Sequence, residues 1–68
     1  MEKLKECRIG NHYSFNYMAK QLGISKTYYW QLEHNQRRIS YEMAIKIASI
    51  FNKKPDEIFY SEFIEKIK

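Results

Sequence analysis

The residues of this 68-residue chain that are best suited to chemistry lie between positions 26 and 38, where hydrogen-bonding, aromatic and positively charged side chains come together. Lys26 can donate hydrogen bonds, Gln31 can both donate and accept them, and Arg37 carries a permanent positive charge. Such side chains suit the recognition of a polar, negatively charged surface. Catalysis is not expected, because the sequence offers no nucleophile with a nearby base, no paired carboxylates on an inward face and no phosphate-binding loop.

Metal and cofactor chemistry is not expected either. Cys7 is the single cysteine, so no internal disulfide can form, and His12 and His34 lack the spacing of metal ligands. We therefore expect no metal, no cofactor and no small-molecule ligand. The length permits one small core, so we expect a single domain over residues 1–68 that relies on efficient helix packing or on a partner subunit.

The positive charge is concentrated in the middle of the chain. Residues 20–54 contain seven Lys or Arg and two acidic residues, a balance of +5, whereas residues 55–68 contain four acidic and two basic residues, a balance of −2. Segregated basic charge is typical of a protein with a polyanion partner; a solvated surface with ordinary lysines is the alternative. No apolar run approaches the roughly 20 residues that cross a bilayer, and no signal peptide is visible, so we expect a soluble cytoplasmic protein without membrane contact.

Capping signals and hydrophobic spacing predict short helices and almost no strand. The first helix covers roughly residues 2–9. Ser14 and Ser25 are expected as N-caps of the second and third helices, and Gly23 permits a tight turn between them because glycine adopts left-handed backbone conformations at little cost. Two helices joined by such a turn form a helix-turn-helix unit, here over about residues 14–34.

Two more helices are expected after this unit. Asn35 can end the third helix in a left-handed conformation, and Ser40 can cap the fourth. Pro55 suits the first position of a fifth helix, which belongs to a helical tail over about residues 55–67. Three apolar residues return at helical intervals in this tail: Phe63, Ile64 and Ile67. They are candidates for a dimer contact, and the alternative is that they cover the core of their own domain.

The third helix should have one buried and one exposed face. At roughly 100° per residue, the inward side carries Tyr29, Leu32 and Glu33. The opposite side carries Thr27, Gln31 and His34. Tyr28 and Trp30 fall on the flanks, where packing against neighbouring helices is the alternative to a role in binding.

The order and spacing of these stretches resemble the phage-repressor-like (Cro and Xre type) helix-turn-helix family. The resemblance runs from Leu4 to Phe59 through LKECR, YSFNYMAKQLGIS, KTYYWQLE, ISYEMAIKIASIF and KKPDEIF. It implies an all-α fold, a five-helix lambda-repressor-like DNA-binding domain whose second and third helices form the helix-turn-helix. It also implies an ion pair between Arg8 and Glu33, and an inward carboxylate needs such a partner.

Three positions depart from the family pattern. Phe15 stands where the family usually has a glutamine that contacts phosphate, so Asn16 is the candidate replacement for that contact. Asn35 stands where a glycine is usual, and Lys54 stands where Ser or Thr is usual. We expect neither of the last two changes to alter the fold.

The resemblance assigns base recognition to the third helix, since a helix fits the major groove of duplex DNA. Gln31 can bind adenine through two hydrogen bonds, Lys26 can donate to guanine, and the methyl group of Thr27 can contact thymine. The candidate base readers are Lys26, Thr27, Tyr28 and Gln31. The candidate phosphate contacts are Asn16, Trp30, Asn35, Arg37 and Arg38.

We therefore expect a sequence-specific regulator of transcription that binds double-stranded DNA, as a repressor. One domain of this size reads few base pairs, so a homodimer on an inverted repeat is expected, with half-sites about 34 Å apart. The alternative is a protein-interaction module of the same fold, such as an antitoxin or a regulator-binding partner, that uses its aromatic surface. Stacking of single-stranded nucleic acid on the aromatic residues is a third interpretation.

Overall fold

Four helices and a fifth helical segment make up residues 1–60, which are the residues that the computed structural model describes. Their bounds are Glu2–Gly10 for α1, Phe15–Leu22 for α2, Lys26–Glu33 for α3, Tyr41–Ile50 for α4, and 55–60 for the last segment. The described part contains no strand. The all-α fold with a helix-turn-helix formed by the second and third helices is therefore confirmed. The expected dimer residues Phe63, Ile64 and Ile67 lie outside the described residues.

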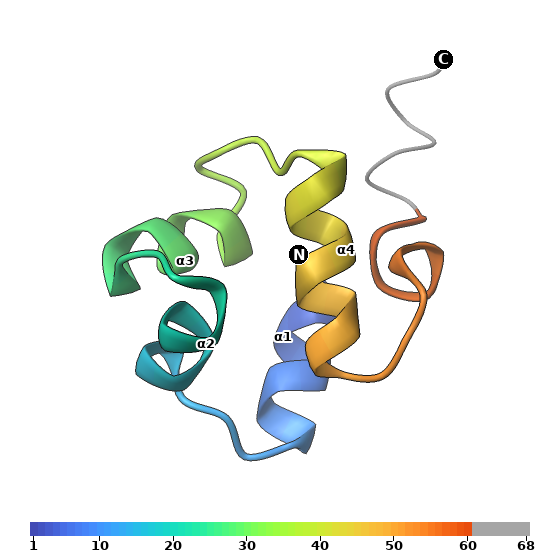
Figure 1. The fold of residues 1–68 in the computed structure, drawn as a ribbon, viewed down its shortest axis with the longest axis horizontal. Coiled ribbons are helices and arrows are strands. Elements are labelled where there is room, and N and C mark those ends of the chain that lie inside the picture. Colours follow the sequence, from blue (N-terminus) through green and yellow to red (C-terminus); the bar gives the residue numbers. More distant parts are fainter. Residues whose placement is uncertain (61–68) are drawn as a thin grey trace.

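The helices are arranged so that α2 and α3 lie together at one side of α4, and residues 55–60 lie at its other side (Figure 1). The largest contact between elements joins α2 to α3; α1 also packs on α3, and α2 on α4. No helix within residues 1–60 has the length and apolar character needed to cross a membrane.

Serine side chains start three of the helices. Ser14, Ser25 and Ser40 are the N-caps of α2, α3 and α4, and each hydroxyl accepts a hydrogen bond from the backbone N–H three residues later, at 3.0, 3.0 and 3.1 Å. Such a cap satisfies a backbone donor that the helix leaves free and stabilises the helix by about 1 kcal/mol. The three N-caps predicted from the sequence are confirmed.

Left-handed backbone conformations end α2 and follow α3. Gly23 has φ +69°, which turns the chain between the two helices of the helix-turn-helix. Asn35 has φ +59°, and the N–H of the next residue donates to the carbonyl of Gln31 at 2.8 Å. Asparagine tolerates this conformation better than most residues. Asn35 thus replaces the usual glycine, as expected, without loss of the turn.

The start of the helical segment 55–60 shows how Lys54 is accommodated. The backbone N–H of Lys54 donates to the carboxylate of Glu57 at 2.6 Å. This is the reciprocal half of a capping box, in which an acidic residue in the first turn accepts from the N-cap backbone. Pro55 follows at the first helical position, where its missing N–H costs nothing. The helix therefore begins where predicted, although Lys54 has no hydroxyl with which to cap it.

All five helical segments contribute to one core. Leu4, Met18, Tyr29, Ile47 and Phe59 come from successive segments, and each is fully buried. A side chain of this kind stabilises a fold by about 1.5 to 3 kcal/mol when it is fully buried. No segment can leave the domain without exposing one of these side chains to water.

A buried ion pair joins α1 to α3. Arg8 donates through Nε to Oε2 of Glu33 at 2.8 Å and through Nη2 to Oε1 at 2.9 Å. Arg8 is 9% exposed and Glu33 is 4% exposed. The hydrogen bond with Glu33, ahead of the opposing effect of burial, raises the pKa of Arg8. Two parallel bonds between planar groups fix both the distance and the relative rotation of the two helices.

The surroundings of the pair satisfy and cover the arginine. Nη1 of Arg8 donates to the backbone carbonyl of Tyr13 at 3.1 Å. The ring of Phe15 lies against the guanidinium, with its centroid 4.1 Å from Cζ. This contact between a cation and an aromatic face excludes water from one side of the pair. Phe15, which replaces the glutamine usual in the family, therefore covers the ion pair.

We expect Arg8→Met and Glu33→Leu, made singly, to be strongly destabilising, because each leaves one buried charge without its partner. The cost should be about 3 to 5 kcal/mol, which is comparable to the whole stability of so small a domain. The double variant removes both charges and should recover most of that loss. Urea unfolding followed by circular dichroism measures all three. The prediction would be contradicted if the single variants were as stable as the unchanged protein. It would also be contradicted if the double variant lost as much free energy of unfolding as the two single variants lose together.

Tyr29 combines full burial with an unbonded hydroxyl. Its side chain is 0% exposed, and its oxygen has no hydrogen-bond partner among residues 1–60. Burial first, and then the negative charge of Glu33, raise the pKa of Tyr29 well above its ordinary value. The folded state therefore keeps a proton that the unfolded chain loses near pH 10.

Stability should therefore fall as the pH rises above about 10, by up to roughly 1.4 kcal/mol per pH unit from this residue. Tyr29→Phe removes the ionisable group and an unsatisfied polar atom, so it should be neutral or stabilising at pH 7 and should reduce the alkaline loss. Urea midpoints at about pH 8 and about pH 11 measure both effects. Tyr28→Phe, on the same helix, is the matched control, and this variant should lose as much stability at alkaline pH as the unchanged protein. A large destabilisation by Tyr29→Phe at pH 7 would mean that the hydroxyl is bonded after all.

Candidate nucleic-acid interface

The exposed face of α3 carries the residues that the sequence assigned to base recognition. Lys26 and Thr27 are exposed in its first turn, and Tyr28 and Gln31 are half-buried. Thr27 and Gln31 are four residues apart, so they lie on the same face one turn from each other. The opposite side buries Tyr29, Leu32 and Glu33, and the predicted orientation of the helix is therefore confirmed.

A shallow groove runs between α2 and the start of α3. Asn16 and Lys20 line it from α2, and Lys26 lines it from α3. The groove thus brings the expected phosphate residue Asn16 next to one of the expected base readers. Lys20 was missed from the sequence, although it follows Asn16 by four residues and so shares its side of α2. That spacing was the signal that could have identified it.

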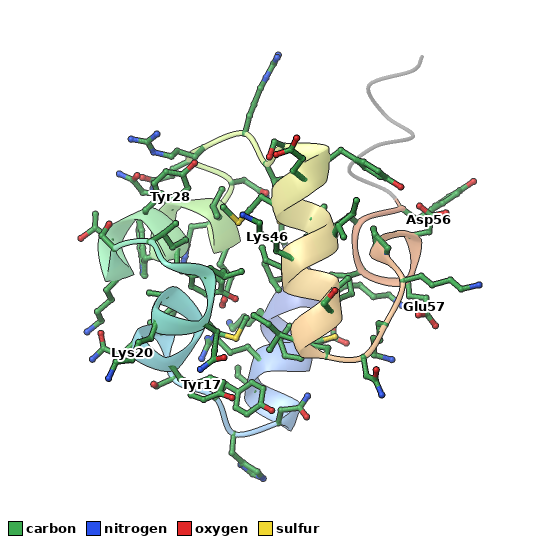
Figure 2. The ribbon with its side chains drawn as sticks, in the orientation of Figure 1. Tyr17, Lys20, Tyr28, Lys46, Asp56 and Glu57 are labelled. Atoms are coloured by element: carbon green, nitrogen blue, oxygen red, sulfur yellow. The ribbon has the colours of Figure 1, made fainter. Side chains whose placement is uncertain are left out.

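Charge is distributed unequally across the domain. Lys20 and Tyr28 lie on the side formed by α2 and α3, whereas Asp56 and Glu57 lie at the opposite edge (Figure 2). Lys53 and Lys54 directly precede these acidic residues, so within residues 1–60 the separation of charge along the sequence is only in part a separation in space. The side of α2 and α3 exposes Lys20 and Lys26, and their positive charge favours a negatively charged partner there.

Trp30 lies on the flank of α3 and is 38% exposed. Its ring stacks on His34 with centroids 3.9 Å apart and planes at 16°. Nδ1 of His34 also lies 2.8 Å from the carbonyl oxygen of Trp30. One face of the indole is thus occupied by the histidine, while Trp30 still borders an open hollow with Lys26 and Thr27. The indole of Trp30 therefore packs on His34 with one face and remains partly open to a binding partner.

Arg37, in the loop that follows α3, contacts two side chains of that helix. Its Nε donates to Oε1 of Gln31 at 2.9 Å. Its guanidinium carbon lies 4.6 Å from the centre of the Tyr28 ring. The side chain of Arg37 therefore lies on α3, against two of the expected base readers, and its expected phosphate contact stays a prediction.

The remaining candidates, Asn35 and Arg38, follow α3 along the chain. Arg38 is exposed in the loop between α3 and α4. Asn35 is exposed beyond the C-terminal end of α3, and it borders a hollow with Glu2 and Lys5 of α1. Asn35 is therefore at the other end of α3 from Lys26, and the structure does not bring these two residues together.

Comparison with known proteins agrees with this geometry. Residues 4–58 match the family described as helix-turn-helix. An uncharacterized HTH-type transcriptional regulator, YvzC of Bacillus subtilis (strain 168), is 29% identical to the chain over 58 residues, which are 85% of this chain and 75% of that protein. No solved structure matches the chain. The family match runs from Leu4, within α1, to Ile58, in the segment that follows α4, and the chain belongs to the helix-turn-helix family of the Cro and Xre type.

Proposed function

We propose that this protein is a regulator of transcription that binds double-stranded DNA in a sequence-specific manner and acts as a repressor. The observation that carries the proposal is a short helix, α3, locked from behind by a buried ion pair and exposing hydrogen-bonding side chains in front. A helix presented in this way fits the major groove, where every base pair offers a distinct pattern of donors, acceptors and methyl groups. The family match and the name of the Bacillus subtilis relative support the same function.

The proposed division of labour follows from where each side chain lies. Lys26 and Thr27, in the exposed first turn of α3, are proposed to contact base edges. Asn16 and Lys20 across the groove, and Arg38 in the loop, are proposed to hold phosphates. Phosphate contacts position the domain on DNA, and base contacts supply its specificity.

A homodimer is part of the proposal, because one α3 spans only a few base pairs. An apolar side chain is exposed for such a contact on α4, where Ile45 is 42% exposed. Two copies related by a twofold axis would present two α3 helices to one face of the duplex.

A protein-interaction role for the same fold is the second candidate, and the exposed ring of Trp30 favours it. Aromatic residues are enriched where proteins bind tightly to other proteins. The two functions differ in their response to salt, because binding that depends on phosphate contacts weakens steeply with salt whereas an apolar protein contact persists.

We expect selection of bound duplexes from a random pool to enrich an inverted repeat whose half-sites are about 10 base pairs, or 34 Å, apart. The repeat follows from twofold symmetry of the dimer. Sequencing of the bound fraction reports the site, and sedimentation reports the mass of the complex. Absence of any enriched sequence overturns the proposal of specific recognition; enrichment of a single half-site bound by one copy overturns the dimer alone.

We also expect Lys20→Ala and Arg38→Ala each to weaken binding to all duplexes, because phosphate contacts are independent of sequence. Each lost contact should reduce the slope of log affinity against log salt by about 0.9. Lys53→Ala is the matched control: it removes an exposed lysine from the turn after α4, away from α3 (Figure 1), and should leave the slope unchanged. Equal slopes for all three variants would contradict the proposed orientation on DNA.

A further inference from the structure

The side chain of Arg37 is attached to α3 although its backbone lies in the following loop. Asn35, at φ +59°, reverses the chain immediately after α3, and the N–H of residue 36 bonds to the carbonyl of Gln31. This turn brings residue 37 back beside residue 31. The side chains then complete the contact, with Nε of Arg37 2.9 Å from Oε1 of Gln31 and the guanidinium 4.6 Å from the centre of the Tyr28 ring.

The contact determines which way the amide of Gln31 points. Arginine has donors and no acceptor, so the atom that faces Arg37 must be the amide oxygen. A two-bond contact with adenine requires the same oxygen to accept from the base while the amide nitrogen donates to it. Oε1 has a second lone pair, so the bond to Arg37 does not forbid that contact, but it fixes the direction in which the amide oxygen points. Within this arrangement, Gln31 holds the arginine.

The free part of Arg37 has the geometry that guanine requires. Nη1 and Nη2 have no hydrogen-bond partner among residues 1–60, because the contact with Gln31 uses Nε alone. Guanine presents two acceptors, O6 and N7, side by side in the major groove, and the two terminal nitrogens of an arginine bind them together. The planar, rigid fork of arginine makes this pairing specific in a way that lysine cannot reproduce.

The cluster formed by Tyr28, Gln31 and Arg37 also lies in a place that suits base recognition. Gln31 lies one turn beyond Thr27 on the exposed face of α3, so Arg37 is carried onto the face that is proposed to enter the groove. The half-buried ring of Tyr28 supports the guanidinium from its flat side. A side chain already ordered in the free protein loses less conformational freedom when it binds. Arg38, the next residue, is exposed and makes no such contact with residues 1–60.

We propose that Arg37 reads a guanine base directly, and that Gln31 and Tyr28 are positioning residues that hold its guanidinium toward the base. The proposal rests on the proposed DNA-binding function. It changes the assignments made from the sequence, in which Gln31 read adenine and Arg37 held a phosphate.

The test compares Arg37→Ala, Arg37→Lys and Arg38→Ala in competition binding on the selected duplex and on duplexes with each single base pair changed. We expect Arg37→Ala and Arg37→Lys to lose a roughly 10- to 100-fold preference for guanine at one position. Arg38→Ala is the matched control and should weaken binding equally on every duplex. Circular dichroism checks that each variant remains folded, which is expected because both arginines are exposed.

Variants of Gln31 and Tyr28 test whether these two residues hold the guanidinium of Arg37 in position. Gln31→Glu keeps an acceptor for Nε and should keep the guanine preference, although its charge weakens binding overall; Gln31→Ala should reduce the preference. Tyr28→Phe keeps the aromatic ring and should keep the guanine preference. Tyr28→Ala removes the ring and should reduce the preference. In the free protein, the Nε–H signal of Arg37 in nitrogen-15 NMR should be protected from exchange, and that protection should disappear in Gln31→Ala.

Four results would overturn the inference. Uniform weakening by Arg37→Ala across all duplexes would make Arg37 a phosphate contact. Loss of an adenine preference in Gln31→Ala, with the guanine preference intact, would make Gln31 the reader. Failure of the unchanged protein to select any duplex would overturn the DNA-binding function and this inference together, whereas selection of a site without an Arg37-dependent guanine overturns this inference alone.

Discussion

The paired hydrogen bonds between Arg8 and Glu33 are the constraint on which the rest of the domain depends. α3 has eight residues, and a helix that short has little stability of its own in water. Its orientation must therefore come from its neighbours. Apolar packing is nearly independent of direction, whereas a two-point contact between a guanidinium and a carboxylate permits one rotation of α3 relative to α1. The third bond, to the carbonyl of Tyr13, extends the same constraint to the segment that leads into α2.

The exposed face follows from this fixed rotation. With Glu33 held inward, helical periodicity turns Thr27 and Gln31 outward, and Tyr28 and Trp30 fall between the two sides. Phe15 shields the ion pair between Arg8 and Glu33, because its ring lies on the guanidinium of Arg8 and keeps water from it. The chain has thus used a position that contacts phosphate in the family to cover the interaction that orients its helix. The exposed polar side chains of Asn16 and Lys20, on the same helix as Phe15, line the neighbouring groove.

The surface presented by α3 extends beyond the helix itself. The left-handed turn at Asn35 returns the chain toward α3, and the side chain of Arg37 then lies over Tyr28 and Gln31. The donors at this end of the face are therefore supplied by the loop, while the helix supplies the support. A similar combination of packing and access occurs at Trp30, whose ring is stacked on His34 and still partly open to solvent.

Much of this architecture can be read from local patterns along the chain. Ser14, Ser25 and Ser40 act through the backbone three residues away, and Gly23 acts through its own φ angle, so neither effect needs a distant contact. Helical periodicity likewise identified the buried side of α3, because it depends only on spacing within one element. Folding of the chain in three dimensions settled the rest. Lys20 lines a groove because α3 crosses its own helix, Phe15 covers the ion pair because Arg8 lies beneath it, and Arg37 contacts Gln31 because the turn at Asn35 returns the loop to α3. Each of these contacts joins residues that no repeat along the sequence connects, and so each depends on how the helices and the loop pack together.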